Sequence, residues 1–157
     1  MDPTALKTTS LCTLVLLIKW YMTVSIQGNT RFRAGSRSPE DALFSNAMGV
    51  PDVEQNFGVH QETRESNAVK EEARWQRILA NDIENIPLGL LIAWSSLSTA
   101  KAPGVHVAAI VLFTVARIIY TVMYAHSLQP HRSIAWTLAT AAVLVLSVNG
   151  VIGAFSF

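Results

Sequence analysis

The chain is poor in cysteine, and this scarcity limits its chemistry. Cys12 is the only cysteine among 157 residues, so no disulfide can form within one chain. Because Cys12 lies inside an apolar run, we interpret it as a small buried hydrophobe rather than as a nucleophile.

A strong excess of positive charge is also missing. The formal net charge is +1 at pH 7, and the basic residues are scattered along the sequence. Binding to nucleic-acid phosphates requires a concentrated basic face, so the sequence argues against a nucleic-acid partner. We also predict no metal site.

Acidic residues are absent from long stretches of the chain. They gather between Glu40 and Glu84, none follows Glu84, and long apolar runs occupy most of the remaining sequence. This segregation indicates a membrane protein with one large polar connection. Four segments each supply most of the about 20 residues that a helix needs to cross the hydrocarbon core. The predicted helices cover about residues 10–26, 74–97, 105–126 and 132–157.

The predicted fold class is all-α, an integral membrane four-helix bundle. Backbone groups in lipid must be hydrogen-bonded internally, so helices are the only reasonable structure for four apolar runs. The connections at residues 98–104 and 126–131 are short and contain Pro or Gly, which makes neighbouring helices antiparallel. We therefore predict a single up-down antiparallel domain over residues 1–157.

The first connection, about residues 27–73, is long and polar. A short helix is expected at "SPEDAL" (residues 38–43), where serine can cap a helix that starts with proline and two acids. The first connection and the third connection contain most of the basic residues of the loops. We therefore expect both connections on the cytoplasmic side and both termini on the other side. A cleaved signal peptide is the less favoured alternative, because Lys19 interrupts the first apolar run.

Charged residues lie at similar depths in three of the predicted helices. A rise of about 1.5 Å per residue puts Lys19, Glu84 and Arg117 roughly 12–15 Å from the cytoplasmic helix ends. Spacings of three and four residues place further polar side chains on the same helical stripes. These stripes are Arg74, Arg77, Asn81 and Glu84 on the second helix, and Arg117, Tyr120 and Tyr124 on the third. A charge facing lipid is costly, so we interpret both stripes as lining a polar pocket.

This polar layer has a structural and a functional interpretation. Glu84 and Arg117 can form an ion pair that only fixes helix register, and Asp82, off the stripe, is expected to be a helix-interface or capping partner. However, the arginines outnumber the acids that could pair with them in the layer. Surplus guanidinium groups indicate an anionic ligand with carboxylates. The arginines are Arg31, Arg74, Arg77, Arg117 and Arg132.

Four motifs together resemble the membrane-associated proteins in eicosanoid and glutathione metabolism (MAPEG). The resemblance covers nearly the whole chain, in order, and is strongest to the microsomal glutathione transferases and microsomal prostaglandin E synthase. The motifs are "PEDAL" (residues 39–43), "ANDIENI" (80–86), "VARIIYTVMY" (115–124) and "QPHRS" (129–133).

The resemblance implies a homotrimer of four-helix subunits that binds glutathione as cosubstrate at each subunit interface. It also implies a place in the endoplasmic reticulum membrane, or additionally the mitochondrial outer membrane, with the active site toward the cytoplasm. Carried over motif by motif, the implied glutathione-binding residues are Arg31, Arg77, Asn81, Glu84, Arg117, Tyr120 and Tyr124.

Three further residues are expected to carry the chemistry. Arg132 and Ser133, with free N–H groups at a helix start, would stabilise a glutathione thiolate and lower the thiol pKa. Asp41 is a proton relay by resemblance to the synthase, and a simple helix N-terminal acid is the alternative.

Two departures from the family pattern affect this site. Family members commonly follow the residue that matches Arg77 with Ala-His and a basic or polar residue. This chain instead has Ile78, Leu79 and Ala80, so one glutathione contact is expected to be missing. Trp136 stands where the prostaglandin synthase has tyrosine, which keeps an aromatic ring but removes a phenol.

The resemblance favours a membrane-bound glutathione transferase acting on hydrophobic electrophiles, with peroxidase activity toward lipid hydroperoxides as an extension. "NDIENI" and "QPHR" favour the transferases, whereas Ser133 after Arg132 favours the alternative, a glutathione-dependent prostaglandin E synthase. A non-enzyme alternative is a small bundle that conducts ions or binds another membrane protein. An ion path requires polar residues through the full membrane depth, and the outer halves of the helices are expected to be apolar apart from Ser and Thr.

Overall fold

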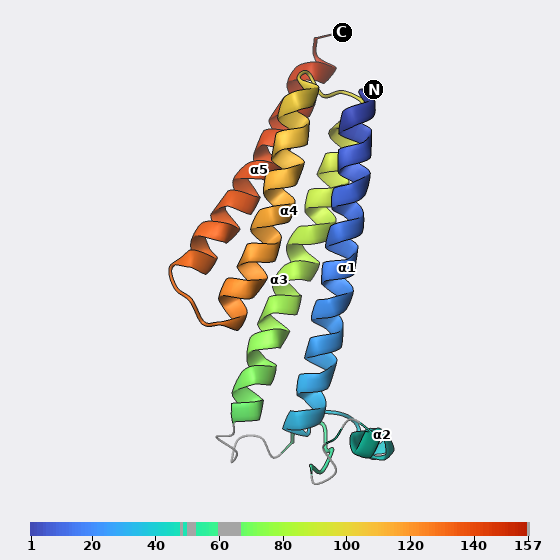
Figure 1. Cartoon of the computed structure of the whole chain (residues 1–157), viewed down its shortest axis with the longest axis vertical. Coiled ribbons are helices and arrows are strands. Elements are labelled where there is room, and N and C mark those ends of the chain that lie inside the picture. Colours follow the sequence, from blue (N-terminus) through green and yellow to red (C-terminus); the bar gives the residue numbers. More distant parts are fainter. Residues whose placement is uncertain (48, 50–52, 60–66, 157) are drawn as a thin grey trace. The chain divides into compact units, whose positions relative to one another are not determined.

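The computed structural model describes residues 1–47, 49, 53–59 and 67–156 (Figure 1). The regular elements in these ranges are all helices, which confirms the predicted all-α class. They are α1 (Pro3–Ala34), the 3-10 helix η1 (Pro39–Asp41), α2 (Ala42–Ala47), α3 (Asn67–Ser96), α4 (Pro103–Ala125) and α5 (His131–Ala154).

Three of these helices, α1, α4 and α5, are long and apolar enough to cross a membrane. The protein is therefore a membrane protein. The fourth long helix, α3, begins with a charged stretch that includes Lys70, Glu71 and Glu72, and its apolar stretch follows only after Glu84. Among the described helices, α3 is therefore the long one that does not meet the length and composition expected of a membrane-crossing helix, whereas the sequence predicted four such helices.

The helices α1 and α3 are longer than predicted, so the polar connection is shorter than residues 27–73. Apolar runs mark only the part of a helix suited to lipid, whereas the backbone hydrogen bonds continue through polar sequence. The end of α1 is set by Gly35, whose φ of 75° is the left-handed conformation that glycine adopts easily. The N–H of Gly35 donates to Phe32 O (3.2 Å) and that of Ser36 to Arg31 O (3.1 Å), which closes the helix end.

The short helix expected at residues 38–43 is confirmed as η1 followed by α2. Pro39 is its first residue, as predicted, but Ser38 makes no side-chain capping hydrogen bond to the backbone.

Contacts divide the chain into two compact units, residues 1–19 with 81–157 and residues 20–80. The first unit contains the start of α1, the end of α3, and all of α4 and α5, which run side by side as four antiparallel segments (Figure 1). The first turn of α1 and the last turn of α5 lie at the same end of this unit (Figure 1). This arrangement agrees with the predicted four-helix bundle.

The core of the first unit is apolar and closely packed. Leu16, Ile110, Phe113 and Leu146 are almost fully buried, and the buried Cys12 belongs to the same cluster, as predicted. A Cβ atom added to Gly89 would come within 2.3 Å of the Phe113 ring. Helices α3 and α4 therefore approach closely where glycine removes the side chain.

The end of the first unit near the connection between α3 and α4 is less apolar than predicted from the sequence. His106 is fully buried, and its Nε2 lies 3.1 Å from Thr9 Oγ1. Asn149 Oδ1 accepts from the Ala102 N–H (3.0 Å), and Asn149 Nδ2 donates to Ala102 O (3.1 Å). These hydrogen bonds join neighbouring segments of the bundle, while His106 Nδ1 is buried with no hydrogen-bond partner among the described residues.

Candidate active site

A buried ionic cluster joins α1, α3 and α4 in the first unit. Arg117 Nη2 donates to Asp82 Oδ1 (2.5 Å), and Lys19 pairs with the second carboxylate oxygen of Asp82. Arg117 Nη1 also donates to Asn81 Oδ1 (2.8 Å). Both Asp82 and Arg117 have no exposed surface. The polar layer predicted from the sequence is therefore present. Its central acid is Asp82, whereas the sequence predicted Glu84.

The alternative pairing of Glu84 with Arg117 is wrong. The buried face of α3 in this unit runs through Asp82, Ile86, Gly89 and Ala93, at spacings of four, three and four. Two residues beyond Asp82, the helix has turned by about 200°, so Glu84 is on the exposed side. Glu84 forms no ion pair with any residue in the described part of the chain. The expectation that Asp82 is a helix-interface partner is confirmed.

Arg117, predicted as a ligand for glutathione, is enclosed by its own chain. Two of its nitrogens donate to Asp82 and Asn81, and its Nε is buried with no hydrogen-bond partner among residues 1–47, 49, 53–59 and 67–156. Its Cζ lies 4.8 Å from the centre of the Tyr120 ring. Arg117 therefore supports Tyr120 from inside the bundle, and Tyr120 in turn lines a pocket.

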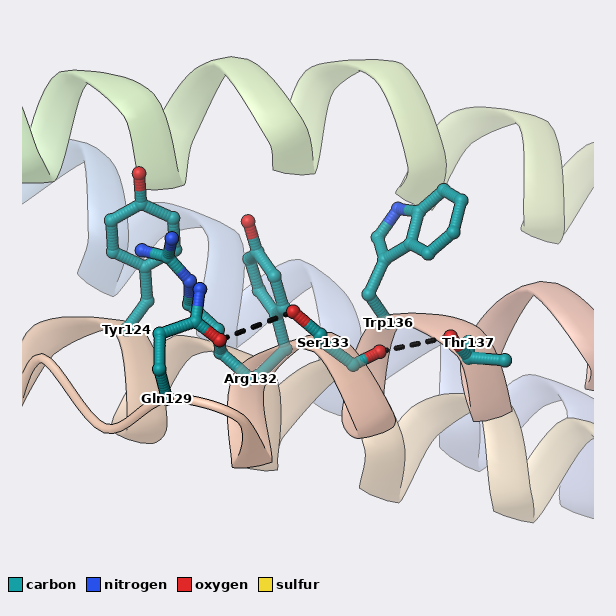
Figure 2. A pocket seen from close by; sticks show the side chains of 7 residues that line it. Tyr124, Gln129, Arg132, Ser133, Trp136 and Thr137 are labelled. Atoms are coloured by element: carbon teal, nitrogen blue, oxygen red, sulfur yellow. Dashed lines mark hydrogen bonds between the residues drawn. The ribbon is translucent and has the colours of Figure 1, made fainter.

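That pocket has a volume of about 430 Å³, which is within the usual range for small-molecule sites (Figure 2). Its lining comes from the end of α4, the connection to α5 and the first turns of α5. Arg132 is the only charged residue among the described lining residues. The lining is formed by Tyr120, Tyr124, Gln129, Arg132, Ser133, Trp136 and Thr137.

An aromatic pair holds the arginine of the pocket in place. Tyr120 and Tyr124 meet edge to face, with ring centres 5.7 Å apart. The Arg132 Cζ lies 4.5 Å from the centre of the Tyr124 ring, so the guanidinium stacks on an aromatic face. The stacking orients a permanent positive charge in the pocket without neutralising it.

Ser133 lies beside Arg132 in the first turn of α5, as the adjacent residues of the motif require. The sequence predicts free backbone N–H groups at this helix start, and for Arg132 and Ser133 this prediction is wrong. The N–H groups of Arg132 and Ser133 donate to Leu128 O (3.3 Å) and Pro130 O (2.9 Å). Because the preceding turn uses these donors, an anion in the pocket depends on the side chains of Arg132 and Ser133.

The MAPEG family model matches residues 9–152. The chain belongs to the MAPEG family. It is 29% identical to prostaglandin E synthase of Macaca fascicularis and 30% identical to prostaglandin E synthase of Homo sapiens, each over 145 residues. Each alignment covers 88% of this chain and 83% of the relative. The resemblance inferred from the four motifs is thus confirmed.

In this MAPEG protein the remaining predicted site residues belong to the second unit. Arg31 Nη2 donates to Ser36 O (3.2 Å), so Arg31 helps to close the end of α1. Asp41 Oδ2 accepts from Arg37 Nη1 (3.3 Å), in a partly exposed pair with a spacing of four residues. Arg77 is exposed on α3.

Two residues with clear roles in the structure were missed by the sequence reasoning. Arg37 pairs with Asp41, but Arg37 lies before the start of η1, so the four-residue spacing rule for helices gives no signal for this pair. Gln129 contacts Ser133, and it lies three and four residues before Arg132 and Ser133 at a helix start. The described residues contain no group of three or more His, Cys, Asp and Glu that could hold a metal ion.

Proposed function

We propose that this MAPEG protein binds glutathione in the pocket of Figure 2 and activates it as a thiolate. The observation that carries this proposal is the placement of the Arg132 guanidinium and the Ser133 hydroxyl in one pocket whose described lining contains no acid. A fixed positive charge and a hydroxyl donor both favour the anionic form of a thiol. Family membership adds independent support, because glutathione use is a MAPEG property.

The other predicted ligands would hold the rest of glutathione. The tripeptide carries two carboxylates and one amino group, and arginine binds carboxylates through paired hydrogen bonds. We propose Arg31 and Arg77 for the carboxylates, and the exposed Glu84 for the amino group. Asn81 and Arg117 would act by shaping the site, since Arg117 is enclosed and Asn81 accepts its hydrogen bond. Asp41 stays a proposed proton relay, restrained by Arg37.

The exposure of Glu84 supports assembly of several copies. On α3 it stands among the exposed apolar residues Ile83 and Leu88, and a carboxylate facing lipid is costly. We propose a homotrimer in which a neighbouring copy covers this face and glutathione binds between subunits. The proposed location is the endoplasmic reticulum membrane, with the pocket toward the cytoplasm.

The proposed reaction is attack of the thiolate on a hydrophobic electrophile that enters from the bilayer, giving a glutathione conjugate. Reduction of lipid hydroperoxides is an extension of the same chemistry. The second candidate is a glutathione-dependent prostaglandin E synthase, which the two named relatives favour. Trp136 lines the pocket and is 42% exposed as a residue, so an aromatic or lipid substrate would meet an indole there.

One set of assays tests this proposal. The purified protein is incubated with glutathione and, separately, a chlorinated aromatic, a lipid hydroperoxide and a prostaglandin endoperoxide. Conjugate formation supports the transferase, and isomerisation of the endoperoxide supports the synthase. If glutathione fails to bind and no product forms with any substrate, the enzyme proposal is overturned, and an interaction or ion-conducting bundle becomes the better explanation.

A further inference from the structure

The side-chain amide of Gln129 lies between the two residues proposed to act on the thiol (Figure 2). One end of the amide is 3.2 Å from Ser133 Oγ. The other end is 2.5 Å from Arg132 Nη2 and also contacts Arg132 Nε. Gln129 therefore touches both Arg132 and Ser133 at once.

The chemistry of arginine decides which end of the amide is oxygen. A guanidinium group has only N–H donors, so the atom that faces it must be an acceptor. The amide oxygen of Gln129 therefore faces Arg132, and the amide nitrogen faces Ser133 Oγ. The opposite orientation, drawn in Figure 2, would set the amide nitrogen against the guanidinium, donor against donor.

This orientation determines what Ser133 can do. A serine hydroxyl has one proton and two acceptor lone pairs. When Ser133 Oγ accepts from the amide nitrogen of Gln129, its proton is not used in that contact and can be donated to an anion in the pocket. The backbone N–H groups of Arg132 and Ser133 already donate to carbonyls of the preceding turn. An anion beside these two residues would therefore receive its hydrogen bond from the Ser133 hydroxyl rather than from their backbone.

We infer that Gln129 is a positioning residue that holds Arg132 and turns the Ser133 proton toward the sulfur of glutathione. The inference rests on the proposed function, and it deepens that function by naming the group that prepares the thiolate site. A purely structural role of Gln129 in the turn before α5 would affect stability but would leave the pKa of a bound thiol unchanged.

The decisive variant is Gln129→Glu. A carboxylate has only acceptors, so it would accept a hydrogen bond from the Ser133 hydroxyl, which could then not donate to the sulfur, and it would also neutralise Arg132. The ultraviolet absorbance of the thiolate, followed against pH with saturating glutathione and full-length protein in detergent, should show a bound-thiol pKa raised by about 1–2 units. Gln129→Ala, which removes both contacts but adds no charge, should give a smaller rise in the same direction.

Two controls separate this role from general damage. Gln76→Ala changes an exposed glutamine on α3 outside the pocket and should titrate like the wild type. In a Ser133→Ala background, Gln129→Ala should raise the pKa by less than it does in the wild type, because the proton that Gln129 orients is gone. Thermal unfolding of each variant verifies that the bundle is intact.

The outcomes distinguish this inference from the proposed function. If the wild type shows no bound thiolate at any pH, the proposed function fails and the inference fails with it. If the wild type holds a thiolate but folded Gln129→Glu and Gln129→Ala titrate as the wild type does, the inference alone is overturned. A raised pKa in both variants, with the larger change in Gln129→Glu, supports it.

Discussion

The first unit contains two arginine clusters that share a contact with a tyrosine ring but differ in burial and in their other partners. In the inner cluster, Arg117 binds Asp82 and Asn81 and lies against the Tyr120 ring, with no exposed surface. In the outer cluster, Arg132 lies against the Tyr124 ring and lines an open pocket. Both guanidinium groups lie against a tyrosine ring, and within the described part of the chain only the inner one is paired with a carboxylate.

The two arginines differ in whether a carboxylate lies within reach. A buried ion pair must satisfy its own charges, and losing one partner leaves the other uncompensated in a medium of low dielectric. An arginine that has only neutral neighbours retains its charge for a ligand. We therefore propose a structural role for the inner cluster and a chemical role for the outer cluster, and mutations in each cluster test this division.

The largest effect is expected from Asp82→Ala. This change leaves Lys19 and Arg117 without their shared carboxylate inside the bundle, and it should destabilise the fold by about 3–5 kcal/mol. Denaturant unfolding in detergent measures the loss. Glu71→Gln, on the exposed face of α3, is the matched control and should unfold like the wild type. Wild-type stability of Asp82→Ala would mean that the inner cluster has no structural role.

Arg117→Ala should come next, because Asp82 then keeps Lys19 as its partner. We expect lower stability than the wild type but higher stability than Asp82→Ala. Glutathione binding to the folded variant, measured by calorimetry, should change little. If Arg117 instead binds a glutathione carboxylate directly, the folded variant would lose about 1.5–3 kcal/mol of binding free energy for glutathione. That result would restore the role for Arg117 predicted from the sequence.

Helix content was predictable from the sequence because hydrophobic runs of membrane length have few structural solutions. Helix ends were less predictable, since the end of α1 depends on the conformation of Gly35 and on carbonyls of the same turn. The polar layer was also predictable from depth. The ion pairing within the layer was not predictable, because the choice between Asp82 and Glu84 depends on which face of α3 meets α4. Apolar residues of α3 occur on several of its faces, so the sequence does not identify that face.

The outer cluster was predictable only as a motif. "QPHRS" placed Arg132 and Ser133 together, but the sequence does not show that Leu128 and Pro130 use the N–H groups of the helix start. These bonds depend on the geometry of the turn, which residue types alone do not determine. The contact of Gln129 with both side chains has the same origin.

Arg132→Leu tests the chemical side of the comparison. The inner cluster stays intact, so thermal unfolding should change little, whereas the pKa of bound glutathione should rise by about 1–3 units. Turnover at pH 7 should fall because less thiolate is present, and it should recover partly as the pH rises. Thiolate absorbance against pH measures the shift directly. If Arg132→Leu binds no glutathione but is folded, Arg132 is a carboxylate clamp and the thiol is activated elsewhere.

Ser133→Ala should give the smallest effect of the series. It removes the hydrogen bond from one neutral donor to the thiolate while the charge of Arg132 stays in the pocket, and a close cation is expected to stabilise the thiolate more than a single hydroxyl does. The bound-thiol pKa should therefore rise by less than in Arg132→Leu, and glutathione affinity should be nearly unchanged. Ser133→Thr keeps the hydroxyl, so its bound-thiol pKa should be close to the wild-type value. Because Ser133 is exposed and distant from Asp82 in the sequence, neither change should alter unfolding. A Ser133→Ala variant that titrates like the wild type would leave Arg132 as the sole activating group in the outer cluster.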